Sequence, residues 1–116
     1  MKILIVDDDL SILRLYQEEL EEEGYQIVTA ATGKEGLEKF DAEEFDLVTL
    51  DIHLPDIDGI KLLRQMKERK PRMPIIMSTA YDYRDDFSVW ASEAYLVKSA
   101  DLTEMKATIK KLAGKE

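Results

Sequence analysis

Short runs of apolar residues alternate with amphipathic segments along the whole chain. The runs are rich in β-branched residues, as buried strands are, and they cover residues 2–6, 25–30, 45–50, 74–79 and 94–97. Between the runs, apolar residues such as Leu10, Leu13 and Tyr16 recur at helical spacing. Since strands and helices alternate and each strand is almost continuously apolar, the pattern predicts a parallel sheet covered by helices on both faces.

Local signals mark the ends of the expected helices. The first helix begins near Leu10, with Asp9 as the expected cap, and ends before Gly24. Thr32 and Glu35 have the spacing of a capping box and open a second helix. The remaining helices are expected at about residues 59–68, at a two-turn segment starting near residue 85, and at residues 102–112 behind a cap at Asp101.

The predicted fold class is therefore α/β, with three layers and a doubly wound, five-stranded parallel sheet. The five strand-and-helix units occupy all 116 residues. We expect a single domain over residues 1–116, with no output domain, because no Gly/Ser-rich linker or repeat interrupts the pattern.

Composition narrows the class of protein. Hydrophobic residues make up 45% and charged residues 35%, which is an ordinary balance for a globular domain. The net charge of −9 disfavours direct binding to nucleic acid, and the absence of cysteine excludes disulfides and thiolate metal sites. The first apolar run is too short for a signal peptide and none is long enough to span a membrane, so a cytoplasmic location is expected.

Polar residues follow the strands at the edge where ligands bind in open α/β sheets. These residues are Asp7, Asp8, Asp9, Asp51, Ser78, Thr79 and Lys98. Crowded carboxylates repel one another, and Mg²⁺ would relieve that repulsion because it prefers oxygen ligands and also binds phosphate. An aspartate can then accept a phosphoryl group as a carboxylate nucleophile.

The motifs at these strand ends resemble those of response-regulator receiver domains. The matching stretches are ILIVDDD, LDIHLPDIDG, IIMSTAY and YLVK, and the resemblance covers residues 2–112. It implies a flavodoxin-like fold with the strand order 2-1-3-4-5.

The resemblance also implies roles for individual residues. Asp51 would be the phosphoacceptor, and Asp7 and Asp8 would be the acidic pair that binds Mg²⁺ with it. His53 would contribute its backbone carbonyl to the metal, whereas its side chain is interpreted as peripheral. The neighbouring Asp56 and Asp58 are interpreted as turn residues.

The resemblance implies that a second group of residues responds to phosphorylation. Thr79 would bond a phosphoryl oxygen, Lys98 would pair with the phosphoryl group, and the rotamer of Tyr95 would follow Thr79. The implied function is a phosphoryl-accepting switch of a two-component phosphorelay, and not an enzyme with an external substrate. The partners would be a sensor histidine kinase or histidine phosphotransfer protein upstream, and an unknown protein downstream.

Three residues are candidate partner contacts. Leu15 falls off the apolar stripe of the first helix when successive residues are placed about 100° apart, and Ser11 lies beside it. Trp90 would offer an aromatic anchor if part of it is exposed. The acidic run at residues 18–23 is interpreted either as a solvated face or as a partner-recognition surface.

Two features depart from the family pattern. Ser99 follows Lys98 where the family usually has proline, so we expect a trans peptide here because a cis bond before a non-proline residue costs about 2.5–4 kcal/mol. The connection between Thr79 and Tyr95 also looks shortened. We expect its helix to be unusually short, with Phe87, Trp90 and Ala91 packing it against the sheet.

Three other functions remain open. A degenerate receiver could act as a phosphorylation-independent protein-binding module. A small-molecule phosphotransferase of one aspartyl-phosphate class would need a second acid two residues after the nucleophile, where this chain has His53. A flavodoxin-like cofactor binder would need a phosphate-cradling loop after the first strand, where the sequence is DDDLS.

Overall fold

The structure is a computed structural model, and it describes residues 1–79, 94–97 and 102–113. Its strands are β1 (Lys2–Val6), β2 (Gln26–Ala30), β3 (Leu47–Leu50), β4 (Ile75–Thr79) and β5 (Ala94–Val97). Its helices are α1 (Leu10–Glu22), α2 (Gly33–Ala42), α3 (Gly59–Arg69) and α4 (Thr103–Ala113). The predicted short helix near residue 85 and the peptide bond before Ser99 lie outside the described residues.

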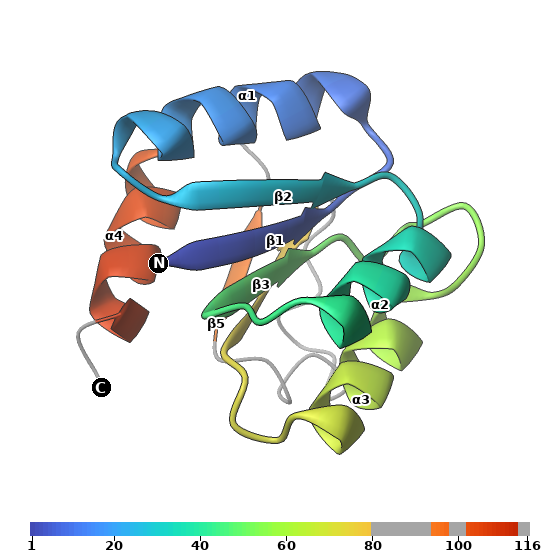
Figure 1. Cartoon of the computed structure of the whole chain (residues 1–116). Helices are drawn as coiled ribbons and strands as arrows, with labels where there is room; N and C mark the ends of the chain where they lie inside the picture. Colours follow the sequence, from blue (N-terminus) through green and yellow to red (C-terminus); the bar gives the residue numbers. More distant parts are fainter. Residues whose placement is uncertain (80–93, 98–101, 114–116) are drawn as a thin grey trace.

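All strand pairs in the sheet are parallel (Figure 1). The order is β2-β1-β3-β4-β5, with β1 between β2 and β3. The predicted flavodoxin-like arrangement is confirmed for the order β2-β1-β3-β4, and β5 pairs with β4 at the far edge. Because every strand runs in the same direction, the carboxyl ends of all strands meet at one edge of the sheet.

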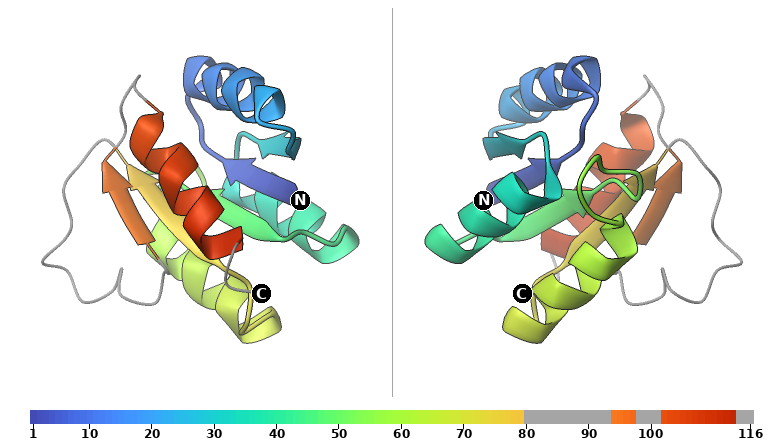
Figure 2. Two further views of the ribbon diagram at one scale, coloured as in Figure 1. Left: turned by 90° about the vertical axis from the view of Figure 1, so that its left-hand side faces the viewer. Right: turned by 90° about the vertical axis from the view of Figure 1, so that its right-hand side faces the viewer.

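The helices form two layers around the sheet (Figure 2). Residues alternate along β1, so Leu4 and Val6 join the apolar cluster that contains Phe40 of α2 and Leu62 of α3. The residues that alternate with them, Ile3 and Ile5, join the cluster that contains residues of α1 and α4. Both faces of β1 are therefore buried, which explains its continuous apolar run.

The expected helix caps are present where they can be tested. The side chain of Asp9 accepts hydrogen bonds from the N–H groups of Ser11 and Ile12 at the start of α1, and Thr32 accepts one from Glu35 at the start of α2. Gly24 follows α1 with a φ of 94°, a conformation that favours glycine. The predicted cap at Asp101 lies outside the described residues.

The acidic end of α1 contacts α4. Lys106 Nζ lies 3.1 Å from Glu19 Oε2 and 3.5 Å from Glu23 Oε1. Glu19, followed by Glu23, raises the pKa of Lys106 by bonding its charged form. Part of the acidic run thus pairs with a helix on the same face of the sheet, a contact that the sequence did not indicate.

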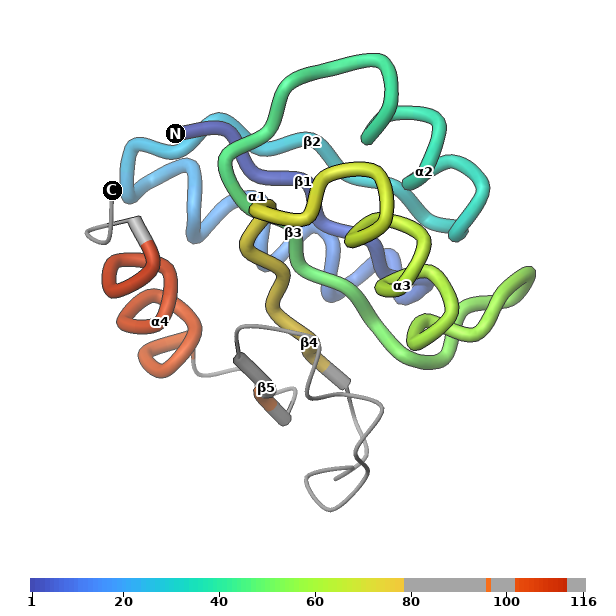
Figure 3. The backbone as a smooth tube through the Cα atoms, turned by 90° about the horizontal axis from the view of Figure 1, so that it is seen from below, coloured from blue at the N-terminus to red at the C-terminus, as the bar shows by residue number. Residues whose placement is uncertain are grey.

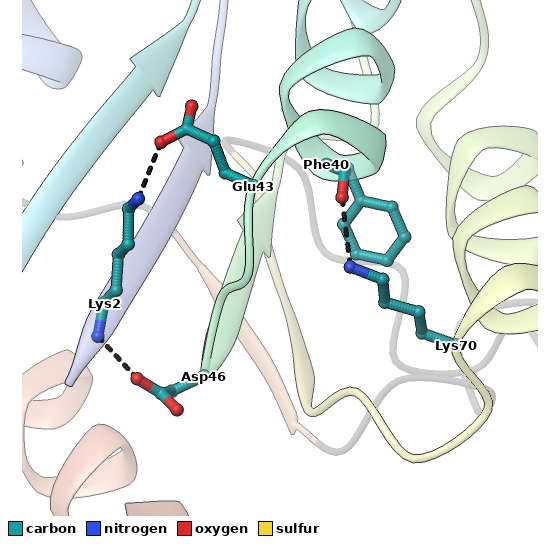
Figure 4. A network of polar contacts seen from close by, with 5 residues as sticks. All are labelled: Lys2, Phe40, Glu43, Asp46 and Lys70. Carbon is teal, nitrogen blue, oxygen red and sulfur yellow. Dashed lines mark hydrogen bonds and ion pairs between the residues drawn. The ribbon is translucent and has the colours of Figure 1, made fainter.

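Polar contacts join neighbouring segments at the amino-terminal edge of the sheet (Figure 4). Lys2 contacts Glu43 through its ammonium group at 2.6 Å and Asp46 through its backbone N–H at 2.7 Å. Lys70 donates to the carbonyl oxygen of Phe40 at 3.1 Å, and its ammonium group lies 4.7 Å from the centre of the Phe40 ring. These contacts hold the edge opposite the strand exits.

Candidate functional site

Two aspartates meet at the ends of adjacent strands. The register pairs Val6 of β1 with Leu50 of β3, so Asp7 and Asp51 leave the sheet side by side. The N–H of Asp51 donates to the carbonyl oxygen of Val6 at 3.0 Å, which continues the ladder to the site. Carboxylate oxygens of Asp7, Asp8 and Asp51 all lie within 4.8 Å of one another.

The burial of these three carboxylates differs. Asp7 is 3% exposed and Asp51 is 4% exposed, whereas Asp8 lies at the surface. Asp7 accepts a hydrogen bond from the N–H of Asp9 at 2.9 Å, which directs one of its oxygens toward the start of α1. Two buried carboxylates and one exposed carboxylate form an all-oxygen donor set that fits a hard divalent cation, so the cluster is consistent with Mg²⁺ binding.

The loop that follows Asp51 folds back on itself. The N–H of Gly59 donates to the carbonyl oxygen of Ile52 at 2.7 Å, and His53 forms an antiparallel bridge with Asp58. A Cβ at position 59 would overlap the carbonyl oxygen of Asp51 and lie 2.6 Å from the Cα of Ile52. Glycine is therefore required here by a close backbone approach.

The interpretation of Asp56 and Asp58 as simple turn residues was incomplete. Asp58 caps α3 by accepting a hydrogen bond from Ile60 N–H at 2.8 Å. Asp56 accepts two hydrogen bonds from the first residues of α2. The sequence showed no sign of this second contact, because its partners are more than twenty residues away.

The predicted switch residues lie at the ends of β4 and β5. Thr79 is the last residue of β4 and pairs with Val97, while Tyr95 pairs with Met77. The side chains of Thr79 and Tyr95, and all of Lys98 and Trp90, lie outside what the structure describes. Ser78 is described and buried, and its Oγ lies 3.4 Å from the hydroxyl of Tyr16 on α1.

The first half of α1 borders a surface groove. The groove is lined by Leu10, Ser11, Arg14, Leu15 and Glu18. Leu15 is half-buried and packs against the cluster shared by α1 and α4, so the prediction that it stands away from the core was only partly right.

Leu10 has helical spacing with Leu13 and Tyr16, but unlike them it is not part of the core. Its side chain is 70% exposed. Leu10 is the first residue of α1, and its side chain lines the surface groove instead of joining a core cluster.

Comparison with known proteins identifies the family of this chain. Residues 3–110 match the family described as the response regulator receiver domain. The chain is 39% identical over 112 residues to the alkaline phosphatase synthesis transcriptional regulatory protein PhoP of Bacillus subtilis, covering 94% of this chain and 47% of that protein. The chain spans about half or less of the length of the first curated relatives that it matches.

Solved structures agree with this match. The response regulator TrrA of Thermotoga maritima in complex with Mg²⁺-BeF superposes with a TM-score of 0.92 at 46% identity, covering 96% of this chain and 97% of that one. The same regulator in complex with the histidine kinase ThkA gives a TM-score of 0.91 at 46% identity, with the same coverage.

None of the described helices combines the length and the apolar character that a membrane span needs. The matched range includes both aspartate-bearing strand ends and the described strands and helices, apart from the first residue of β1 and the last three residues of α4. The chain belongs to the response regulator receiver domain family.

Proposed function

We propose that this chain is a phosphorylation-dependent signalling switch in which Asp51 accepts a phosphoryl group. The observation that carries the proposal is the cluster of Asp7, Asp8 and Asp51, whose carboxylate oxygens lie within 4.8 Å of one another at a strand edge. Two of these carboxylates are buried and would repel each other without a cation. Such a cluster suits a site for a metal and a phosphoryl group better than a site with only a structural role.

The proposed Mg²⁺ ligands are the carboxylates of Asp7, Asp8 and Asp51 and the backbone carbonyl of His53. When bound, Mg²⁺ would offset the negative charge of the carboxylates and of an incoming phosphoryl group. The exposed position of Asp8 leaves one side of the cluster open to solvent, which suits an ion that keeps several waters.

The proposed reaction is the transfer of a phosphoryl group between two side chains. A carboxylate oxygen of Asp51 attacks the phosphorus of a phosphohistidine, a P–O bond forms, and the P–N bond breaks. The bonding pair returns to the imidazole nitrogen, which takes up a proton as the donor leaves. Asp51 suits this role because the β1–β3 ladder holds its backbone at the strand end.

The response to phosphorylation is assigned to Thr79, Lys98 and Tyr95. A phosphoryl group adds about −1.5 to −2 charge and new acceptor oxygens, which a hydroxyl and an ammonium group can bond. Inverting a two-state population from 1:99 to 99:1 requires about 5.5 kcal/mol of differential stabilisation. Two charge-assisted contacts in a partly buried site can supply much of this energy.

The proposed partners are a histidine kinase or histidine phosphotransfer protein upstream and a further protein downstream. The similar regulator TrrA has been solved with a histidine kinase, which supports the upstream partner. The groove along the first half of α1 combines apolar, polar and charged side chains, and its lining includes exposed Leu10 together with Ser11 and Leu15. Trp90 remains a candidate partner contact. The proposal also includes a cytoplasmic location and the absence of an external substrate.

The kinase-docking part of the proposal can be tested at Leu10. Leu10→Lys should slow phosphotransfer from any phosphorylated histidine kinase that phosphorylates the wild type, since it replaces an exposed apolar side chain of the groove with a charged one. Phosphorylation by acetyl phosphate should be unchanged, because this small donor needs no docking surface. Equal rates of phosphotransfer from the kinase to the wild type and to Leu10→Lys would contradict a role for this groove in kinase docking.

The central test is intact mass after incubation with acetyl phosphate, with and without Mg²⁺. The wild type should gain one phosphoryl group only with Mg²⁺, and Asp51→Asn should gain none. A folded wild type that gains no phosphoryl group with any of several donors would favour the alternative, a degenerate receiver that binds proteins without phosphorylation.

A further inference from the structure

The carboxylate of Asp56 joins two segments that lie far apart in the sequence. One of its oxygens accepts a hydrogen bond from the N–H of Gly33 at 2.8 Å, and the other accepts one from the N–H of Lys34 at 2.9 Å. These N–H groups belong to the first turn of α2 and have no partner within the helix. Asp56 therefore connects the loop between β3 and α3, residues 51–58, to the start of α2.

An apolar contact accompanies these hydrogen bonds. Ile57 is half-buried and packs against the core cluster of the α2 and α3 face. A Cβ at position 33 would overlap the side chain of Ile57 and lie 3.2 Å from a carboxylate oxygen of Asp56. The tip of the loop and the first turn of α2 thus fit together without space for a side chain at position 33.

The base of the same loop is held separately. Gly59 bonds the carbonyl oxygen of Ile52, and His53 bridges Asp58. His53, the proposed carbonyl ligand, belongs to this base, and Asp56 at the tip follows it three residues later in the chain. The loop projects beyond the start of α3 (Figure 3), and the contact with α2 adds to the anchoring that its base and the packing of Leu54 and Ile57 provide.

We propose that Asp56 is a positioning residue for the Mg²⁺ site: it anchors the loop to α2 and thereby directs the backbone carbonyl of His53. This inference rests on the proposed function. The direction of a backbone carbonyl depends on the conformation of the surrounding chain. A loop whose tip is not anchored would therefore have to become ordered when the metal binds. Groups that orient metal ligands commonly change metal affinity by about 10- to 100-fold.

Asp56 is suited to this role at neutral pH. Hydrogen bonds from the N–H groups of Lys34 and Gly33 hold the pKa of Asp56 below its usual value. The carboxylate is therefore charged, and each of its oxygens remains an acceptor for one of the two N–H groups. The positive end of the α2 dipole also favours a negative charge at this position.

The test compares Mg²⁺ binding by four proteins using isothermal titration calorimetry. The proteins are the wild type, Asp56→Ala, Asp56→Asn and Thr32→Ala. Asp56→Asn removes the same charge as Asp56→Ala but keeps one acceptor oxygen. Thr32→Ala removes another hydrogen bond from the start of α2, the 3.1 Å bond to Glu35 N–H, and leaves the loop attached.

The dissociation constant of Mg²⁺ should rise about tenfold in Asp56→Ala, the lower end of the usual effect of losing a ligand-orienting group. The dissociation constant of Asp56→Asn should lie between those of the wild type and Asp56→Ala. Thr32→Ala should bind Mg²⁺ as tightly as the wild type does. Hydrogen exchange of the amides at residues 52–58 should accelerate in Asp56→Ala and not in Thr32→Ala. If Asp56→Ala does not fold, weaker Mg²⁺ binding by Asp56→Asn together with faster hydrogen exchange in the loop carries the same conclusion.

Three results would overturn the positioning role. Asp56→Ala could bind Mg²⁺ as tightly as the wild type. Asp56→Ala and Asp56→Asn could be weakened equally, in which case charge alone accounts for the effect. Thr32→Ala could be weakened as much as Asp56→Ala, which would indicate a general effect of a destabilised α2. Failure of the wild type to bind Mg²⁺ at all would instead contradict the proposed function, so the two failures are distinguishable.

Discussion

The α-carbon of Gly59 lies so close to the carbonyl oxygen of Asp51 that no side chain fits between them. This approach closes the loop that leaves the proposed phosphoacceptor, and the bond from Gly59 N–H to Ile52 at 2.7 Å secures it. The start of α3 therefore rests on the backbone that positions Asp51. A change at Gly59 should affect both the stability of the fold and the site.

Gly59→Ala should lower the free energy of unfolding by about 3 kcal/mol, the upper end of the usual cost of overpacking, because backbone atoms must move to admit the methyl group. It should also slow phosphorylation of Asp51 by acetyl phosphate. Urea denaturation and intact mass measure the two effects. Gly24→Ala is the control: position 24 has a φ of 94° but open space around it, so this variant should lose stability and keep the phosphorylation rate.

Asp51→Asn should raise the free energy of unfolding in the absence of Mg²⁺ by about 1–3 kcal/mol. Like charges about 5 Å apart repel by about 3 kcal/mol at an effective dielectric constant of about 20, and the substitution removes one of them. Mg²⁺ should stabilise the wild type by about 2.7 kcal/mol at 100 times its dissociation constant and should stabilise the variant much less. Thermal unfolding with and without Mg²⁺ measures both the effect of the substitution and the effect of the metal on stability.

Asp9→Asn is the matched control for that experiment. Asp9 caps α1 through a side-chain oxygen that asparagine retains, and it lies outside the three-carboxylate cluster. Stabilisation of the Mg²⁺-free protein by Asp9→Asn as large as that by Asp51→Asn would show that general surface charge, rather than the cluster, is responsible.

Tyr16→Phe should lower the free energy of unfolding by only about 0.5–1.5 kcal/mol. The ring is 2% exposed and stays in place, while the hydroxyl contact with Ser78 at 3.4 Å is lost. Tyr16→Ala should cost about 3–5 kcal/mol, because it leaves a cavity between α1 and β4. Urea denaturation of both variants separates the contribution of the hydroxyl from that of the ring. Equal losses of unfolding free energy would mean that the hydroxyl, not the ring, contributes most.

Stability should fall as the pH falls below about 4.5, in part through two residues around the start of α2. The N–H of Ala31 lowers the pKa of Glu35 from 4.5, and the N–H groups of Lys34 and Gly33 lower that of Asp56 from 3.8. Because both pKa values are lower in the folded state, the stabilisation is complete above the unfolded values and is lost as the pH falls toward the folded ones.

The Glu35→Gln, Asp56→Asn double variant should therefore show a shallower decline of melting temperature between pH 5 and pH 3, a window of about two units set by those two pKa values. Thermal unfolding across this range measures the slope. A double variant with the same slope as the wild type would exclude these two carboxylates as sources of the acid sensitivity.

The sequence by itself determined the local elements and the residues that end them. Continuous apolar runs predicted strands buried on both faces, and β1 has this property because Leu4 and Ile5 face opposite helix layers. Asp9 and Thr32 were identifiable as caps because a cap bonds residues two or three positions away. Asp51 was identifiable as a candidate because it directly follows a buried strand.

The tertiary structure alone decided which distant segments meet. Leu10 has helical spacing with the buried residues Leu13 and Tyr16, but spacing alone cannot show that the Leu10 side chain stays 70% exposed. The contact of Asp56 with α2 and the pairing of Lys106 with Glu19 depend on how loops and helices pack, since their partners are far away in the sequence. Local bonding is encoded within a few residues, whereas these contacts arise only when the sheet brings the segments together.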